Sequence, residues 1–155
     1  MSVAFRRESD EEHKEPRFEL PIPLGPNLVT AKGLKLTEAR AAELEAAVAA
    51  EPDAELRAPI ERELRYWRTR LATAELAPPP PQDEAAFGSR VTFRLNGGIR
   101  SLEIVGDDEA DPANGKIAFS APLARALIGA GPGDYSDFGG KADAIEVISV
   151  APITA

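Results

Sequence analysis

Apolar residues recur at alternating steps of three and four in two stretches of the first half of the chain. The first stretch has Leu34, Thr37, Ala41, Leu44 and Val48 at these positions. The second stretch has Ile60, Leu64, Trp67, Leu71 and Ala74. This spacing is typical of a helix that buries one stripe against another helix. Because the connection between the stretches is short, they predict two antiparallel helices, a short coiled-coil hairpin over residues 30–76.

Capping residues and prolines indicate where these helices begin and end. Thr30 is suited to cap the first helix, and Pro52 disfavours helical backbone in the residue before it. Asp53 is suited to cap the following turn. A proline is tolerated best in the first turn of a helix, so Pro59 places the start of the regular second helix near residues 57–59. The apolar stretch of the first helix would reach roughly 24 Å at 1.5 Å per residue.

Proline-rich segments flank the predicted hairpin on both sides. Residues 1–29 mix many charges with prolines and offer little that could pack, so we expect a flexible or extended acidic arm. Residues 77–86 include the run Pro78–Pro81, which favours an extended and semi-rigid polyproline conformation. We therefore expect a Pro-rich linker between the hairpin and a second domain over residues 87–151.

After the linker the pattern changes to that of strands. Val91, Phe93 and Leu95 alternate with polar residues, and an Asn-Gly-Gly turn precedes an apolar return strand. Further strands are expected over residues 116–119, 135–138 and 145–150, and a short helix over residues 122–128. A mostly antiparallel sheet with one helix across a face makes the predicted fold class α+β.

Composition and charge narrow the chemistry that the chain could perform. Its 155 residues carry a formal net charge of −8 and include no cysteine and one histidine, His13. Such an acidic chain is poorly suited to neutralise phosphates, so we expect no direct sequence-specific nucleic-acid binding. Without cysteines or a histidine cluster, we expect no metal, no cofactor and no catalytic residue. No apolar run could span a membrane and the first residues lack an apolar signal segment, so we expect no membrane contact and a cytoplasmic location.

The most distinctive part of the sequence is the stretch over residues 105–129, VGDDEADPANGKIAFSAPLARALIG. It joins an acidic turn, a loop with proline and glycine, a strand, a Ser-Ala-Pro step and a short helix. This string resembles the carboxy-terminal domain of the bacterial GreA/GreB transcription elongation factors, and the likeness extends through residues 87–89 and 133–134. The resemblance implies an FKBP-like fold for residues 87–151.

The front of the chain resembles the same family less specifically. Residues 30–33 (Thr-Ala-Lys-Gly) look like the start of the coiled coil of these factors. Residues 65–67 (Arg-Tyr-Trp) look like part of its returning helix. Because the predicted arms are short, the layout is similar to that of short-armed members such as the nucleoside diphosphate kinase regulator Rnk.

The resemblance also implies a partner and a docking surface. In this family, the loop that leads into the carboxy-terminal helix docks on the rim of the β′ subunit of bacterial RNA polymerase, beside its secondary channel. The matching residues in this sequence are Phe119, Ser120, Ala121, Pro122 and Leu123. The alternative is that Ser120 and Pro122 serve only to begin the helix. We expect a monomer that binds polymerase and regulates elongation, and that is not itself an enzyme.

Members of the family that stimulate transcript cleavage carry acidic residues at the tip of a long coiled coil, where they help to hold a catalytic Mg²⁺ of polymerase. Glu51, Asp53 and Glu55 lie in the turn between the predicted helices, but the other residues of the tip motif are missing. A carboxylate helps to hold Mg²⁺ only when its oxygen lies about 2.0–2.1 Å from the metal. Acidic residues on a short arm would not reach that distance, so the sequence favours a regulator without cleavage stimulation. Two alternatives stay open: a cleavage factor acting through these possible tip residues, and, from the implied fold alone, a peptidyl-prolyl isomerase-like module.

Arginines crowd the second predicted helix, at Arg62, Arg65, Arg68 and Arg70. A run of this kind usually forms a solvated face, here balanced by Glu61 and Glu63, and this is our expectation. The alternative is a basic face directed towards RNA or towards an acidic wall of the channel.

Overall fold

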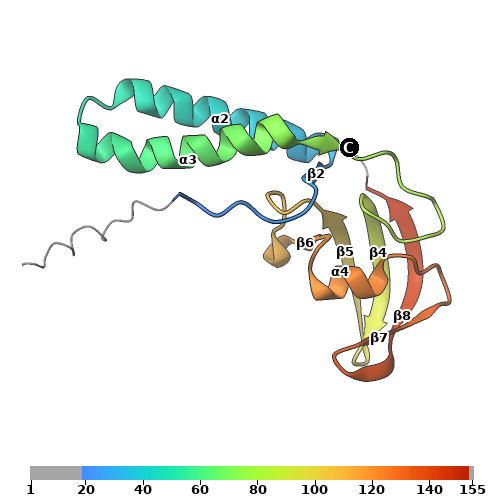
Figure 1. Ribbon diagram of the computed structural model, residues 1–155. Helices are drawn as coiled ribbons and strands as arrows, with labels where there is room; N and C mark the ends of the chain where they lie inside the picture. Colours follow the sequence, from blue (N-terminus) through green and yellow to red (C-terminus); the bar gives the residue numbers. More distant parts are fainter. Residues whose placement is uncertain (1–18, 154–155) are drawn as a thin grey trace, which may run out of the picture.

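Figure 1 shows the architecture of the protein in a computed structural model, which describes residues 19–153. A long helical hairpin extends sideways from one end of a sheet domain, and α4 (Pro122–Leu127) crosses one face of the sheet. The first part of the predicted arm, residues 1–18 with His13, lies outside the described residues. Within the described part, no helix has both the length and the apolar character that crossing a membrane requires.

The hairpin consists of α2 (Ala31–Ala50) and α3 (Ala54–Thr73), each 20 residues long. Thr30 caps α2 as the sequence indicated, and Asp53, which we expected to cap only a turn ahead of the second helix, caps α3 itself. The side chains of Thr30 and Asp53 each accept a hydrogen bond of 2.9 Å from an amide of the first turn. At 1.5 Å per residue each helix is about 30 Å long. The predicted pair of helices is confirmed.

The seam between the two helices is built from the predicted positions. Its buried members include Thr37, Ala41, Leu44 and Leu64. Gly33 is buried beside them, and its carbonyl accepts a hydrogen bond of 2.9 Å from the Thr37 hydroxyl. This bond satisfies the one polar side chain among those seam residues, so the seam can be closed without an unpaired hydroxyl.

The start of α3 differs from our prediction. We expected regular helix from about residues 57–59, but α3 begins at Ala54 and Pro59 lies inside it. The Asp53 cap and the acidic Glu55 in the first turn start the helix earlier. Pro59, the sixth residue of α3, lacks the N–H that would bond to the Glu55 carbonyl, and the helix continues to Thr73 without that bond.

A small parallel pairing closes the base of the hairpin and was not predicted from the sequence. The strand β2 (Leu28–Val29) precedes α2 and pairs with β3 (Glu75–Leu76), which follows α3. Beside it, the buried Asn27 side chain donates hydrogen bonds to the Arg70 carbonyl (2.8 Å) and to Thr73 Oγ1 (3.2 Å). The last residues of the predicted arm are therefore tied to the end of α3.

The carboxy-terminal domain is a five-stranded sheet with the strand order β6-β5-β4-β8-β7. Its strands are β4 (Ser89–Leu95), β5 (Gly98–Val105), β6 (Lys116–Ala118), β7 (Tyr135–Phe138) and β8 (Lys141–Pro152). A short 3-10 turn, η1 (Pro112–Asn114), precedes β6. Strands β5 and β6 run parallel, and the other neighbours run antiparallel. Together with the hairpin, this mixed and mostly antiparallel sheet confirms the α+β layout.

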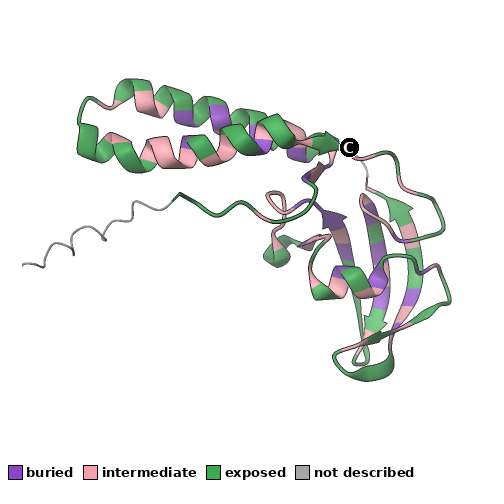
Figure 2. Ribbon diagram, viewed as in Figure 1, coloured by how far each residue is buried: buried purple, intermediate pink, exposed green. Residues whose placement is uncertain are grey.

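The core of this domain lies between the sheet and α4 (Figure 2). Fully buried side chains include Val91, Phe93, Ile104, Leu127 and Ile145. Figure 2 also shows that buried residues are sparse along the outer half of the hairpin. The sheet domain therefore has a conventional apolar core, whereas the outer half of the hairpin depends on a narrow seam.

Candidate functional site

The five residues of the predicted docking loop form the connection from β6 to α4 (residues 119–121) and the first two residues of α4 (Pro122 and Leu123). Phe119, Ala121 and Leu123 are partly buried and pack against the core of the sheet domain. Ser120 and Pro122 are exposed. The backbone turns sharply here, because the Ala121 amide donates a 2.9 Å hydrogen bond to the Ala118 carbonyl. Alternate residues of the loop thus anchor it, while Ser120 and Pro122 face solvent.

Two side-chain contacts attach this loop to the rest of the sheet domain. The Phe119 ring meets the Phe87 ring edge-on, with the ring centroids 5.4 Å apart. The Ser120 hydroxyl donates a 2.9 Å hydrogen bond to Asp107 Oδ1. Ser120 therefore does not cap α4: the residue at the cap position is Ala121, whose side chain makes no capping hydrogen bond, and Pro122 occupies the first turn.

The acidic turn after β5, residues 107–109, lies against the base of the hairpin. Asp108 accepts a hydrogen bond of 2.6 Å from Arg70 Nε and a very short one from the Tyr66 hydroxyl. Glu109 Oε1 accepts a hydrogen bond of 2.6 Å from the Thr30 hydroxyl. The turn that the sequence showed to be acidic is thus the joint between the hairpin and the sheet domain.

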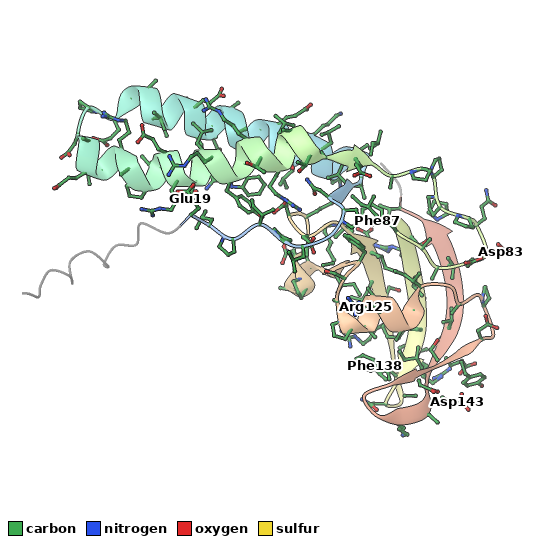
Figure 3. All side chains as sticks on the ribbon, in the orientation of Figure 1. Glu19, Asp83, Phe87, Arg125, Phe138 and Asp143 are labelled. Atoms are coloured by element: carbon green, nitrogen blue, oxygen red, sulfur yellow. The ribbon has the colours of Figure 1, made fainter. Side chains whose placement is uncertain are left out.

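Arg70 contradicts the expectation of a solvated arginine face. Its side chain is only 1% exposed, whereas the side chains of Arg65 and Arg68 are 54% and 57% exposed. Those two pair with Glu19 (2.7 Å) and Glu45 (3.1 Å), rather than with the neighbouring glutamates of α3. Figure 3 shows Glu19 beside α3. Burial is possible for Arg70 because a carboxylate meets its guanidinium, which offsets the cost of removing the charge from water.

The contacts of the same joint change the pKa of Tyr66. Partial burial, together with the hydrogen bond to Asp108, raises the pKa of Tyr66 to about 12. Both causes act in the same direction, because burial disfavours the charged phenolate and the Asp108 carboxylate accepts a hydrogen bond only from the neutral phenol. Tyr66 therefore stays protonated and acts as a hydrogen-bond donor, which excludes it as a general base near neutral pH.

At the far end of the hairpin, two of the three possible tip carboxylates, those of Glu51 and Asp53, accept hydrogen bonds within the turn itself. Glu51 Oε2 accepts a hydrogen bond of 3.1 Å from the Asp53 amide, and Asp53 in turn caps α3 at the Glu55 amide. Arg57 Nη1 donates to the Glu51 carbonyl (2.9 Å). Among residues 19–153, no three carboxylates, histidines or cysteines gather where they could hold a metal ion.

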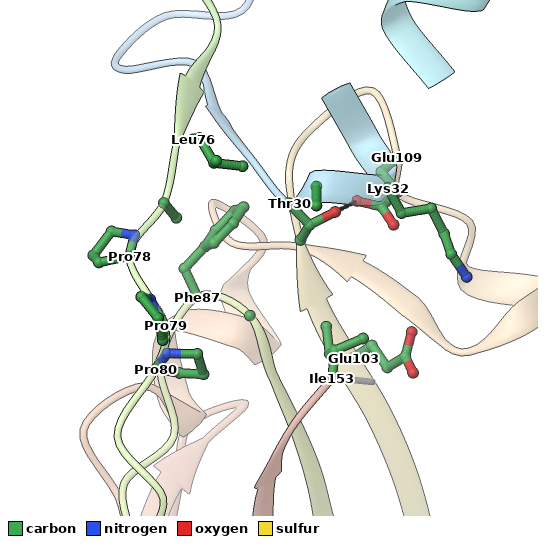
Figure 4. Close-up of a pocket in the computed structure, with 13 residues that line it drawn as sticks. Thr30, Lys32, Leu76, Pro78, Pro79, Pro80, Phe87, Glu103, Glu109 and Ile153 are labelled. Carbon is green, nitrogen blue, oxygen red and sulfur yellow. Dashed lines mark hydrogen bonds between the residues drawn. The ribbon is translucent and has the colours of Figure 1, made fainter. Parts of the chain in front are cut away.

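A cavity of about 300 Å³ lies at the junction of the hairpin, the proline run and the sheet (Figure 4). Its apolar wall includes Leu76, Pro78, Pro79, Pro80, Phe87 and Ile153. The two carboxylates that line it are already engaged, since Glu103 pairs with Lys116 (2.8 Å) and Glu109 accepts from Thr30. The volume is at the lower limit for small-molecule sites, and the lining also includes the charged side chain of Lys32.

Sequence reasoning missed the residues that form the joint, although one signal for them was present. Tyr66 and Arg70 are four residues apart on α3, so their side chains lie on one helix face. Three consecutive acidic residues at positions 107–109 offered matching partners. Their pairing connects positions 38 and 42 residues apart along the chain, which local periodicity does not reveal.

Comparison with known proteins finds similarity in the carboxy-terminal domain. Residues 80–152 match a family model described as "Transcription elongation factor, GreA/GreB, C-term". The chain is 48% identical over 58 residues to transcription elongation factor GreA of Lactococcus lactis subsp. cremoris, covering 36% of this chain and 37% of that protein. It is 41% identical over 73 residues to GreA of Ralstonia nicotianae, covering 44% and 46%. The matched region thus spans less than half the length of these curated relatives.

The solved structures that match most of this chain have low sequence identity to it and low TM-scores. A GreA/GreB elongation factor from Nitrosomonas europaea has 21% identity and a TM-score of 0.40, covering 83% of this chain and 99% of that one. The GreA factor homolog Gfh1 of Thermus thermophilus has 18% identity and a TM-score of 0.37, covering 81% and 99%. Overall likeness at this level does not bear on the arrangement of the site.

Proposed function

We propose that this chain, whose residues 80–152 match the GreA/GreB carboxy-terminal family model, regulates transcript elongation by binding bacterial RNA polymerase near its secondary channel. The observation that carries the proposal is the family match over a domain that includes the loop 119–123. The geometry supports it, since Ser120 and Pro122 face solvent while their neighbours are anchored in the core. A loop held in this way loses little conformational entropy when a partner binds it.

The finer parts of the proposal concern where and how the protein docks. The surface would be the rim of the polymerase β′ subunit, contacted by Pro122 and Ser120 of a monomeric protein whose carboxy-terminal domain is FKBP-like. The isomerase alternative is disfavoured by the placement of the aromatic residues. Phe93 is fully buried, the rings of Phe87 and Phe119 meet edge-on, and of these three only Phe87 lines the cavity.

We further propose that the chain is not an enzyme and does not stimulate transcript cleavage. The hairpin reaches about 30 Å, and a carboxylate assists Mg²⁺ only when its oxygen is in direct contact with the metal. Glu51 and Asp53 already accept hydrogen bonds from backbone amides of the turn. Each of these bonds occupies one carboxylate oxygen and ties the side chain to the turn.

Binding can be tested with the full chain and purified bacterial RNA polymerase. The variant Pro122→Arg places a long charged side chain at the centre of the exposed loop and is expected to weaken binding about tenfold or more, or about 1.4 kcal/mol. Pro112→Arg is the matched control, because Pro112 is another exposed proline at the start of a helical turn. Equal binding by both variants, or no binding of the parent chain, would refute the docking proposal.

Cleavage is tested separately with backtracked elongation complexes. We expect RNA of unchanged length at saturating protein, together with an altered rate of elongation or pausing. Shortened RNA that disappears in the variant Glu51→Gln, Asp53→Asn or Glu55→Gln would establish the cleavage alternative and identify the acid responsible.

A further inference from the structure

The acidic turn at residues 107–109 holds the hairpin in a specific direction. One oxygen of Asp108 accepts from the Tyr66 hydroxyl and the other accepts from Arg70 Nε. The two donors lie one helical turn apart on α3, so a single carboxylate is held at two points along that helix. Such a contact fixes both the position and the rotation of α3 relative to the sheet domain.

The same turn also holds the other helix. Glu109 Oε1 accepts from the hydroxyl of Thr30, the residue that caps α2. Just before the turn, Gly106 lies so close to the Leu28 carbonyl that a Cβ atom would overlap it. Both helices are therefore attached, through their ends at the base, to one short segment of the sheet domain.

The contacts at this joint are largely shielded from water. The side chain of Arg70 is 1% exposed, and those of Asp107 and Asp108 are 18% and 12% exposed. Ion pairs and hydrogen bonds with little solvent access are directional and are weakly screened by salt. The joint is thus suited to hold one orientation, unlike the exposed ion pairs along the hairpin.

The joint continues into the docking loop. Asp107 Oδ1 accepts from the Ser120 hydroxyl, and Asp107 Oδ2 lies 3.9 Å from Arg70 Nη2. One aspartate therefore lies between the exposed loop on one side and α3 on the other. A displacement of either neighbour changes the position of this carboxylate.

We propose that the acidic turn sets the angle at which the hairpin projects from the docking loop, with Arg70, Asp107 and Asp108 as positioning residues. This inference rests on the proposed function for its biological consequence: the loop binds polymerase, and the joint determines where the hairpin then lies. The residues act through geometry and contact no substrate.

The orientation can be measured on the free protein, because the chain has no cysteine of its own. Spin labels at Ala54→Cys, near the hairpin tip, and Ala142→Cys, on the sheet domain, report the distance between the two parts by pulsed electron paramagnetic resonance. We expect one narrow distance distribution in the parent protein. Asp108→Asn should broaden or shift it, and Asp83→Asn, the same change at an exposed position, should leave it unaltered.

Tyr66→Phe provides a milder second variant, since it removes one hydroxyl and leaves the Arg70–Asp108 pair in place. A partial broadening is expected, with unchanged hydrogen exchange in the sheet strands as evidence that this domain stays folded. Distance distributions identical to the parent in both variants would overturn the proposal. A uniform loss of protection in the sheet would also overturn it, because the joint would then only stabilise the fold.

Polymerase measurements connect orientation to function. Asp108→Asn should bind polymerase within about twofold of the parent, since its docking loop is intact, and should lose most of the effect on elongation. Loss of binding and effect in equal proportion would contradict a positioning role. If the parent chain does not bind polymerase, the proposed function fails, and the distance measurement still decides whether the acidic turn sets the angle.

Discussion

The two ends of the helical hairpin use their charged and polar side chains in different ways. At the base, Thr30 and Arg70 contact residues of another domain, at least 38 positions away in the sequence. At the tip, Glu51, Asp53 and Arg57 bond to backbone groups no more than six positions away. The base is a tertiary joint, and the tip is a self-contained turn.

This difference has consequences for both stability and function. A charge at the base is shielded from water, so removing its partner leaves an uncompensated group in a poorly solvated place. A charge at the tip remains hydrated whether or not its local bond forms. Changes at the base should therefore alter the whole molecule, and changes at the tip should have mainly local effects.

The largest effect is expected from Arg70→Met. The substitution keeps the apolar stem and the helix propensity but leaves Asp108 without its ionic partner, so the free energy of unfolding should fall by about 3–5 kcal/mol. Denaturant unfolding followed by circular dichroism measures this change. Arg68→Met is the matched control on the same helix and should cost about 0–1 kcal/mol, because that ion pair is exposed. Equal losses in both variants would remove the distinction between buried and exposed arginines.

The second largest effect is expected from Gly106→Ala, which tests how closely the base of the hairpin is packed against the sheet domain. In Gly106→Ala the new methyl group would overlap the Leu28 carbonyl, so β2 and the sheet domain must move apart, at a cost of about 1–3 kcal/mol. The same substitution at Gly98, in β5, meets its nearest neighbour at 3.7 Å and should be tolerated. Thermal unfolding of the two variants gives the comparison, and similar midpoints would show that the junction yields without strain.

The sequence allowed the local parts of this fold to be predicted. The helix caps Thr30 and Asp53, the Asn-Gly turn and the short helix after the Ser-Ala-Pro step all lie where the local signals placed them. Asn96 and Gly97 have positive φ values of 52° and 80°, as that turn requires. Each of these signals acts over a few residues, so one sequence is enough to detect it.

The features that the sequence did not reveal depend on distant pairing. Arg70 looked like one of four arginines on a solvated face, and no neighbouring residue distinguishes it from Arg68. The strands β2 and β3 have two residues each, too short to show a period, and lie on either side of the hairpin. For the candidate site, the loop 119–123 could be located from its resemblance to a known family, but its contact with Asp107 could not.

Smaller effects are expected when the helix caps at the two ends of the hairpin are removed. Thr30→Ala removes the cap of α2 together with the hydrogen bond to Glu109, and should cost about 2 kcal/mol. Asp53→Ala removes only the cap of α3 and should cost about 1 kcal/mol. Thr30→Ser keeps both bonds and serves as the control in chemical denaturation. If Asp53→Ala lowered the free energy of unfolding more than Thr30→Ala does, the cap at the base would not be the more important of the two.

The smallest effect near neutral pH concerns Tyr66, whose raised pKa of about 12 makes the joint sensitive to strongly alkaline solution. The folded protein holds the phenol proton more tightly than the unfolded chain, whose tyrosine has a pKa of 10.0. The stability linked to Tyr66 is therefore fully present below pH 10 and is lost as the pH rises towards about 12. In Tyr135→Phe, Tyr66 is the one remaining tyrosine, and its tyrosinate absorbance should titrate with a midpoint of about 12. Adding Asp108→Asn removes the negative acceptor and should lower that midpoint, whereas an ordinary midpoint without this second substitution would show that the joint is open to water.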